Sequence, residues 1–257
     1  MISDKAVIDS SKLESSTEVG PFSIIGREVK IGKNVKISSH VVITGDTSIS
    51  DDCQIFSFAS IGNSPQDLKF KGEKTQIIIG KKNKIREYVT INPGTEHGGG
   101  VTKIGDNCLF MISSHIAHDC KIGNNVIIAN NVAIAGHVEI DDNVIIGGNS
   151  AVQQFTRIGK LAMIGGMTGV EKDVIPYGLV TGNRSHLDGI NLIGLKRAGY
   201  SSDEINSLNQ AVKLIFSNSI LKNGIEEAKK FSNFKTVSEV INFLKKSEKR
   251  PICRPLK

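Results

Sequence analysis

Residues 111–123, MISSHIAHDCKIG, place two histidines three positions apart, His115 and His118, with Asp119 directly after the second and a cysteine next. A third histidine, His137, follows 19 residues after His118. Imidazole, carboxylate and thiolate groups are the ligands that zinc prefers. A histidine of near-neutral pKa is also a common general base. The segment therefore admits three interpretations: a metal site, a catalytic base with helpers, or histidines that serve only the scaffold.

A period of six residues predicts the element that carries these side chains. An apolar residue recurs at twelve consecutive sixth positions: Ile104, Phe110, Ile116, Ile122, Ile128, Ile134, Ile140, Ile146, Val152, Ile158, Ile164 and Val170. Four residues after each comes a small or β-branched residue, and the same register runs earlier, from Leu13 to Ile61 and from Ile79 to Ile91. A chain that turns a corner every six residues closes one triangular coil with three hexads. We expect a left-handed parallel β-helix.

The period also predicts which residues meet. One coil takes 18 residues, so Gly136 should stack on His118, with His137 beside it. Adjacent side chains diverge in an extended chain, so we expect Asp119 to point away from His118. The cysteine of the segment, Cys120, falls on the small inward position and belongs to the scaffold.

Composition agrees with a β-rich chain. There are 26 Gly, no Trp and only 3 Tyr, which favours short strands and tight turns. Glycine often follows the inward aliphatic, as at Gly26 and Gly123, where we expect corners that need an unusual φ. The four cysteines show no CxxC spacing, and we find neither a signal peptide nor a membrane-spanning stretch. These features predict reduced thiols and a cytoplasmic protein.

Two interruptions and a change of pattern predict the organisation of the chain. Residues 63–77 and 96–102 break the hexads and should loop out of the prism. After about residue 185 the pattern becomes helical, with capping boxes at Ser201…Glu204 and Thr236…Glu239. We therefore expect a β-helix over 1–185 and an α-helical domain over 186–257 that covers the open end of the prism.

The net charge of +6 lies entirely in the helical part. Residues 1–186 hold 19 basic and 19 acidic residues, whereas residues 187–257 hold 13 and 7. Such an asymmetry suggests a docking surface for an acidic partner. A solvated basic face without a partner is the simpler alternative.

Several segments together resemble one family. IREYVTINPGT (85–95), SHIAHDCKIGN (114–124), NNVAIAGHVEIDD (130–142), IGGNSAVQQF (146–155) and GLKRAGY (194–200) are similar to acyl-ACP–UDP-N-acetylglucosamine O-acyltransferases, and SPQDLKF (64–70) adds to the match. The resemblance covers almost the whole chain. It implies transfer of a 3-hydroxyacyl chain from acyl carrier protein to the 3-hydroxyl of UDP-N-acetylglucosamine, the first step of lipid A synthesis. It also implies a homotrimer with sites between subunits, without cofactor, metal, nucleic acid or stable membrane insertion, and with the basic tail steering the acidic carrier.

The resemblance implies roles for particular residues. His118 is the general base, the backbone carbonyl of His137 helps to fix its tautomer, and the Gly136 N–H is an oxyanion donor. His115 has a supporting role. Polar contacts to the substrate fall on Gln66, Asp67, Lys69, Gln154, Asn191, Lys196 and Arg197, and the length of the acyl chain is limited at Gly166.

The chain also departs from the family pattern. Gln153 stands where many members have a histidine, and Ala198 stands where members often have a second arginine. Arg184 follows Gly182-Asn183 where members have a histidine. Glycine at Gly166 implies a deep slot and a longer acyl chain.

Three rival functions remain open. The related N-acyltransferase of UDP-3-O-acylglucosamine carries a globular domain before its prism, whereas hexads begin here by residue 13. Zinc carbonic anhydrases of this fold use HxxxxH, but this chain has HxxH. A structural scaffold would need neither a base nor a metal.

Overall fold

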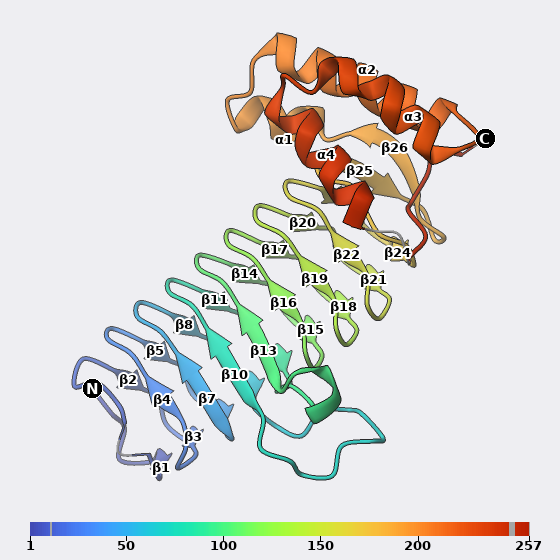
Figure 1. The fold of residues 1–257 in the computed structure, drawn as a ribbon. Helices are drawn as coiled ribbons and strands as arrows, with labels where there is room; N and C mark the ends of the chain where they lie inside the picture. Colours follow the sequence, from blue (N-terminus) through green and yellow to red (C-terminus); the bar gives the residue numbers. More distant parts are fainter. Residues whose placement is uncertain (11, 247–249, 257) are drawn as a thin grey trace.

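The computed structural model describes residues 1–10, 12–246 and 250–256. It is a three-sided prism of short parallel strands, with the α-helices of the described residues gathered at its C-terminal end (Figure 1). The chain contributes strands to the three faces in a fixed order, and we name them the first, second and third face in that order. The first corner joins the first face to the second, the second corner joins the second to the third, and the third corner closes the coil.

Each face is one sheet of strands that are mostly two residues long. The first face runs through β2 (Glu18–Val19), β5 (Lys36–Ile37), β8 (Gln54–Ile55), β11 (Lys84–Ile85), β14 (Leu109–Phe110), β17 (Ile127–Ile128), β20 (Ile145–Ile146), β23 (Met163–Ile164), β25 (Gly178–Thr181) and β26 (His186–Ile190). The second runs through β1 (Val7–Ile8), β3 (Ile24–Ile25), β6 (Val42–Ile43), β9 (Ser60–Ile61), β12 (Thr90–Ile91), β15 (His115–Ile116), β18 (Ala133–Ile134), β21 (Ala151–Val152) and β24 (Gly169–Val170). The third runs through β4 (Lys30–Ile31), β7 (Asp46–Ile49), β10 (Gln76–Ile79), β13 (Val101–Ile104), β16 (Lys121–Ile122), β19 (Glu139–Ile140) and β22 (Arg157–Ile158).

The register confirms the predicted left-handed β-helix. His115 pairs with Ala133 and Lys103 pairs with Lys121, so the regular coils advance by 18 residues. In each two-residue strand of these coils the second residue points inward, and the twelve predicted apolar positions from Ile104 to Val170 are all buried. The core is therefore a column of aliphatic side chains along the axis of the prism.

Each corner has a left-handed residue, but at another position than the glycine that we predicted. The left-handed backbone falls three residues after the inward aliphatic, where asparagine is frequent: Asn107, Asn125, Asn131 and Asn143 have φ between 56° and 61°. Asparagine tolerates this region better than other non-glycine residues. Gly32, by contrast, directly follows the inward aliphatic. Glycine is needed there because a Cβ would lie 2.9 Å from the backbone nitrogen of Asp51 in the next coil. The expectation of an unusual φ was wrong at Gly26, Gly32 and Gly123, but it holds at Gly62, which follows Ile61 where the first loop begins and has φ 89°.

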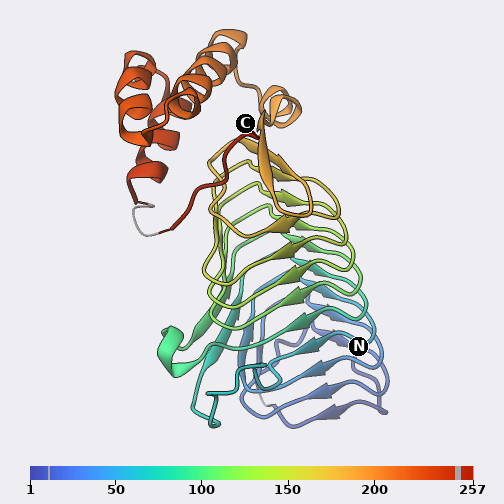
Figure 2. The same cartoon turned by 90° about the vertical axis from the view of Figure 1, so that its right-hand side faces the viewer.

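Both interruptions leave the prism at the second corner. The first occupies residues 62–75 between β9 and β10, and the second occupies residues 92–100 between β12 and β13, including the 3₁₀ turn η1 (Glu96–Gly98). Figure 2 shows them side by side, projecting from one edge of the prism. Two loops on one corner make this edge the most elaborated part of the prism.

The helices follow the last strands. They are α1 (Leu192–Arg197), α2 (Ser202–Ser217), α3 (Leu221–Ala228), η2 (Lys229–Phe231) and α4 (Lys235–Lys246), and they lie over the end of the prism opposite the N-terminus (Figure 2). Ser201 caps α2, as predicted, through a hydrogen bond from the Glu204 N–H, whereas the Glu204 carboxylate accepts the N–H of Thr236 instead of completing the predicted capping box. The second predicted capping box was wrong, because Thr236 lies inside α4 and is buried. In the described residues no helix is long and apolar enough to cross a membrane.

An ion cluster ties the last coils to the C-terminal segment. The carboxylate of Asp173, which has no exposed side-chain surface, lies 3.0 Å from Nε of Arg157 and 3.2 Å from Nε of Arg250. The Arg157 guanidinium also lies over the ring of Phe243 in α4, 4.5 Å from its centroid. The helical part is thus fastened to the prism by buried charge as well as by apolar packing.

Candidate active site

His118 and Asp119 form a hydrogen-bonded pair on the second corner, between β15 and β16. The Nδ1 of His118 lies 2.8 Å from Oδ2 of Asp119, and both residues are buried. Asp119 has φ 60°, which turns its side chain back toward its neighbour instead of away from it. The prediction that Asp119 points away from His118 was therefore wrong, because it assumed an extended backbone at a residue that makes the corner.

The carboxylate of Asp119 is fully occupied by donors. Thr95, in the second loop, donates its backbone N–H to Oδ1 at 2.9 Å and its hydroxyl to Oδ2 at 2.7 Å. The backbone N–H of Asp119 donates to the hydroxyl of Thr102 at 2.8 Å. A carboxylate so surrounded acts as an acceptor only, so His118 must carry its proton on Nδ1 and present Nε2 as the free basic nitrogen.

Gly136 stacks on His118, as the 18-residue coil predicted. A Cβ on Gly136 would lie 2.5 Å from Cε1 and 2.7 Å from Nε2 of the imidazole, so only glycine leaves room for the ring. Within the described ranges, neither Nε2 of His118 nor the N–H of Gly136 has a hydrogen-bond partner. A free base and a free donor thus lie next to each other at the same corner.

His137 lies beside the pair, in the next coil. Its ring meets the His118 ring edge-on with centroids 5.0 Å apart, and it stacks on Phe155 at 4.4 Å. Burial lowers the pKa of His137, while the charges of Asp119 and of Asp67 in the first loop act in the opposite direction. The backbone N–H of His137 donates to the carbonyl of His118, but the contact that sets the His118 tautomer comes from Asp119, not from the carbonyl of His137 as predicted.

His115 points outward from β15 on the second face. Its Nδ1 lies 2.7 Å from the hydroxyl of Thr90 in the preceding coil. Burial, followed by the charge of nearby His118, lowers the pKa of His115 and favours the neutral ring. The side chain is therefore a neutral neighbour of the His118–Asp119 pair, close enough for the charge of His118 to affect its pKa.

The same corner contains the residue types of a metal site. One ligand atom each of His118, Asp119 and His137 lie within 4.8 Å of one another. The Asp119 carboxylate, however, is already filled by Thr95 and His118 and has no exposed surface. Cys120 faces the core, donates its thiol to the carbonyl of Ala135 and has its pKa raised to about 12 by burial. The hydrogen bonds thus favour an oriented base over a coordinated ion, and the cysteine serves the scaffold.

The other predicted site residues fall into three groups, two of which share the second corner with His118. Gln154 is exposed on the same corner as Gly136, one coil further along the prism. The N–H of the next residue, Phe155, donates to the Gly136 carbonyl and so fixes this position. Gln66 and Lys69 are exposed on the first loop, where Asp67 accepts the N–H of Lys69. These two groups therefore lie on the same edge of the prism as the base.

The third group lies on other corners. Asn191 caps α1 and donates its side-chain amide to the carbonyl of Leu161 on the third corner. Lys196 and Arg197 are exposed in the last turn of the same helix. Gly166 belongs to the first corner, where a Cβ would lie 3.3 Å from the carbonyl oxygen of Gly148. A single chain therefore does not bring these four residues together with His118.

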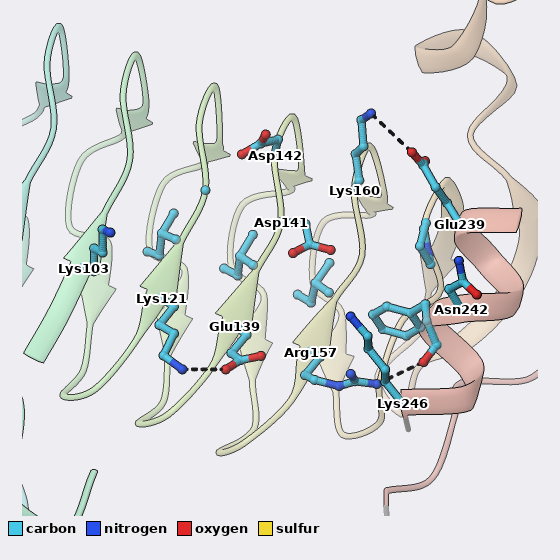
Figure 3. Close-up of a pocket in the computed structure, with 16 residues that line it drawn as sticks. Lys103, Lys121, Glu139, Asp141, Asp142, Arg157, Lys160, Glu239, Asn242 and Lys246 are labelled. Carbon is cyan, nitrogen blue, oxygen red and sulfur yellow. Dashed lines mark hydrogen bonds and ion pairs between the residues drawn. The ribbon is translucent and has the colours of Figure 1, made fainter. Parts of the chain in front are cut away.

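A larger groove lies between the third face and α4, with a cavity volume of about 650 Å³ (Figure 3). Its charges largely neutralise one another: Lys121 pairs with Glu139 at 3.0 Å, and Lys160 lies 4.0 Å from Glu239. None of the predicted site residues line it. A smaller cavity of about 280 Å³ adjoins it and contains Asp119 and His137 in its wall.

The fold and the site together define a class of protein. The profile of the bacterial transferase hexapeptide repeat matches residues 10–45 and 102–136, and the profile described as "Udp N-acetylglucosamine O-acyltransferase; Domain 2" matches residues 173–253. The chain is a hexapeptide-repeat transferase with an appended helical domain of this type.

Relatives of known name identify the family within that class. The chain is 48% identical over 255 residues to the acyl-[acyl-carrier-protein]–UDP-N-acetylglucosamine O-acyltransferase of Thermodesulfovibrio yellowstonii, covering 97% of this chain and 98% of the relative. It is 49% identical to the Rickettsia canadensis enzyme of that name, covering 96% and 94%. The structure of LpxA from Acinetobacter baumannii superposes with a TM-score of 0.94 at 42% identity, over 98% and 99% of the two chains. The chain belongs to the acyl-[acyl-carrier-protein]–UDP-N-acetylglucosamine O-acyltransferase family, as its motifs predicted.

Proposed function

We propose that this protein transfers a 3-hydroxyacyl chain from acyl carrier protein to the 3-hydroxyl of UDP-N-acetylglucosamine, the first step of lipid A synthesis. The observation that carries the proposal is the His118–Asp119 pair, whose free Nε2 lies against Gly136 in a chain of this family. No covalent intermediate is needed, since the sugar hydroxyl can attack the thioester directly.

The pair would perform general acid–base catalysis. Nε2 of His118 takes the proton of the sugar 3-hydroxyl while the oxygen attacks the thioester carbonyl. The imidazolium formed is stabilised by Asp119, which is 2.8 Å away. Collapse of the tetrahedral intermediate breaks the carbon–sulfur bond, and the departing thiolate receives the proton back from Nε2. The products are the 3-O-acylated sugar nucleotide and the free carrier thiol.

The N–H of Gly136 is the proposed donor to the oxyanion of that intermediate. It lies at the same corner as Nε2 and has no other partner in the described part of the chain. An unblocked backbone donor in a water-poor site is worth most where negative charge develops. Gln154 would extend the polar edge, while His115 and His137 line the site as neutral rings.

We further propose a homotrimer with each site between two subunits. The outward residues of the second face contain neither Lys, Arg, Asp nor Glu: Val7, Ile24, Val42, Ser60, Thr90, His115, Ala133, Ala151 and Gly169. The first and third faces carry charged residues at the outward positions of their strands, such as Lys36 and Lys121. An uncharged face that meets two copies of itself around a threefold axis would set the first corner of one subunit beside the second corner of the next.

That arrangement would complete the site. It would bring Gly166, on the first corner of one subunit, toward His118 on the second corner of its neighbour. Asn191, Lys196 and Arg197 would likewise be supplied to the sugar nucleotide from a neighbouring chain, with Gln66, Asp67 and Lys69 on the loop side. The acidic carrier would approach the helical end, where residues 187–257 hold 13 basic and 7 acidic residues. The four buried free thiols agree with a cytoplasmic reaction.

The test is an acyl-transfer assay with purified protein, 3-hydroxyacyl-ACP and UDP-N-acetylglucosamine. We expect His118→Ala to lower kcat at least about 100-fold, the usual range for a general base, and His186→Ala in β26 to leave the rate within about twofold. Full activity in His118→Ala would refute the base. A wild-type protein that transfers no acyl chain would refute the enzyme, and stoichiometric zinc in that protein would favour the metal alternative.

A further inference from the structure

The second loop closes at Thr95 over the catalytic corner, by which we mean the part of the second corner that carries His118 and Asp119. Thr95 ends the stretch that leaves β12 and immediately precedes η1, and it is only 2% exposed. Its carbonyl accepts the N–H groups of Gly98 at 3.0 Å and of Gly100 at 2.8 Å. The loop is therefore folded around Thr95, and Thr95 in turn faces Asp119.

The contact between the loop and Asp119 is close and specific. Thr95 spans both carboxylate oxygens, with its N–H on Oδ1 and its hydroxyl on Oδ2. Gly98 packs on the same carboxylate so tightly that a Cβ there would lie 2.0 Å from Cγ of Asp119. The loop thus excludes water from the carboxylate and replaces it with two fixed donors.

We propose that Thr95 is a positioning residue of the acyl transfer, holding Asp119 ionised and oriented so that His118 keeps Nε2 free for the sugar hydroxyl. The inference rests on the proposed function of His118 as the base. Thr95 is buried, and both its N–H and its hydroxyl donate to Asp119. It acts through Asp119, and the fold of the second loop is what places it there.

The hydroxyl of Thr95 also adjusts how strongly the pair holds a proton. It shares Oδ2 with Nδ1 of His118, at 2.7 and 2.8 Å. A donor on an ionised carboxylate stabilises the charged form. Without the hydroxyl, the carboxylate has one compensating donor fewer and attracts the proton of the imidazolium more strongly. The proton affinity of the pair must then rise.

Other titratable groups surround the pair and remain in place in such a variant. His137 lies 3.8 Å from Oδ2 of Asp119 through its Nε2, and His115 is close enough to sense the charge of His118. The adjoining cavity wall carries charged side chains from the third face, namely Lys121, Glu139 and Arg157. Asp67 acts on His137 from the first loop. None of these groups contacts the Thr95 hydroxyl, so removing it changes one donor only.

The test uses three variants and two measurements. Thr95→Val removes the hydroxyl but keeps the backbone N–H, whereas Thr95→Ser keeps both donors. Thr102→Val is the matched control, because Thr102 is an equally buried threonine that accepts from the backbone of Asp119 and does not contact its carboxylate. The measurements are the pH profile of kcat/KM and an NMR titration of the His118 ring in the free protein.

We expect Thr95→Val to lower kcat about tenfold, the size of one hydrogen bond to a charged group. The acid limb of the kcat/KM profile and the midpoint of the NMR titration of His118 should both move up by about one pH unit. Thr95→Ser should restore both, and Thr102→Val should lower stability without moving the titration. The proposal is overturned if Thr95→Val titrates as the wild type does, or if Thr102→Val shifts it equally.

The two proposals fail in different ways. The NMR titration needs no substrate, so it reports on Thr95 even if the wild type transfers no acyl chain. If His118→Ala keeps its activity, the base assignment fails, and a titration shift in Thr95→Val would then describe only a hydrogen-bonded pair. If the wild type is active and His118→Ala is not, an unshifted titration in Thr95→Val refutes the positioning role alone.

Discussion

At the residue scale, the proposed catalysis depends on the left-handed backbone of one buried aspartate. Asp119 has φ 60° and shares its corner position with His137 and Phe155, which have φ 60° and 64° one and two coils away. In this conformation Nε2 of His137 lies 3.8 Å from Oδ2 of Asp119, and the His137 ring stacks on Phe155. The carboxylate, the imidazole and the phenyl ring therefore stack in one column beside the His118–Gly136 column.

Gly136→Ala tests the packing of the base. The added methyl would lie 2.5 Å from Cε1 of His118, a separation that real contacts do not allow, so the imidazole must move. We expect kcat to fall at least about tenfold, because a misplaced base loses its near-attack geometry. Steady-state kinetics and circular dichroism would check this, and a fully active, folded variant would contradict the stacking.

Two half-buried histidines predict how stability depends on pH. Burial lowers the pKa of His115 and of His137 in the folded protein, so the unfolded chain binds protons that the folded chain does not. Stability should therefore be complete above about pH 6.5, the ordinary pKa of histidine, and fall as the pH drops below it. Urea denaturation at a series of pH values measures this, and His115→Gln should show a shallower loss.

The same residues show how far a sequence can predict such a site. The period alone is enough to stack Gly136 on His118, because stacking follows from counting residues. It could not place Asp119, since the direction of that side chain depends on φ and not on spacing. A signal was present: Asn107, Asn125 and Asn143 occupy the equivalent position in other hexads, and asparagine marks left-handed residues. Thr95 had no signal, because only the fold of its loop brings it to the carboxylate.

At the element scale, the hexads predicted the strands well because each inward residue sits in the same environment. Most glycines directly after an inward aliphatic were misjudged, since their reason is the close approach of the next coil, as at Gly32. The α4 cap was misplaced because Thr236 resembles a capping residue, although packing buries it one residue inside the helix. Tertiary contacts decide such cases, and a local motif does not contain them.

Asp173→Asn tests how the helical part is fastened. The change removes the charge that Arg157 and Arg250 share at 3.0 and 3.2 Å. Breaking a buried pair in this way costs about 3 kcal/mol of unfolding free energy. We expect faster proteolysis of the helical end and a lower urea midpoint.

A surface pair supplies the control for that variant. Glu139→Gln breaks the Lys121–Glu139 contact, in which the side chains are 67% and 44% exposed. Exposed pairs contribute about 0.5 kcal/mol or less, so this variant should unfold like the wild type. Equal losses in the two variants would mean that the Asp173 cluster has no special role.

At the scale of the whole molecule, the uncharged second face predicts the assembly. Val42→Arg places a charge on β6, three strands before β15 in the second face and about 14 Å from it at the spacing of paired strands. We expect monomers in sedimentation velocity and a loss of acyl transfer, although each chain stays folded. Gln54→Arg on β8 of the first face is the control and should sediment as the wild type does. An active trimer in Val42→Arg would remove the second face from the interface.

The 18-residue register determines how the prism opens. Each coil contacts only the coils before and after it, so the prism behaves as a one-dimensional stack. Unfolding can therefore spread from one end, one coil at a time. The helices cover one end, while β1 at the other end pairs with β3 alone on its face. Fraying should begin at the N-terminal coil and advance toward the catalytic corner, and amide hydrogen exchange should slow down coil by coil in the same direction. The N-terminal coils would then act as a buffer that keeps thermal opening away from the base.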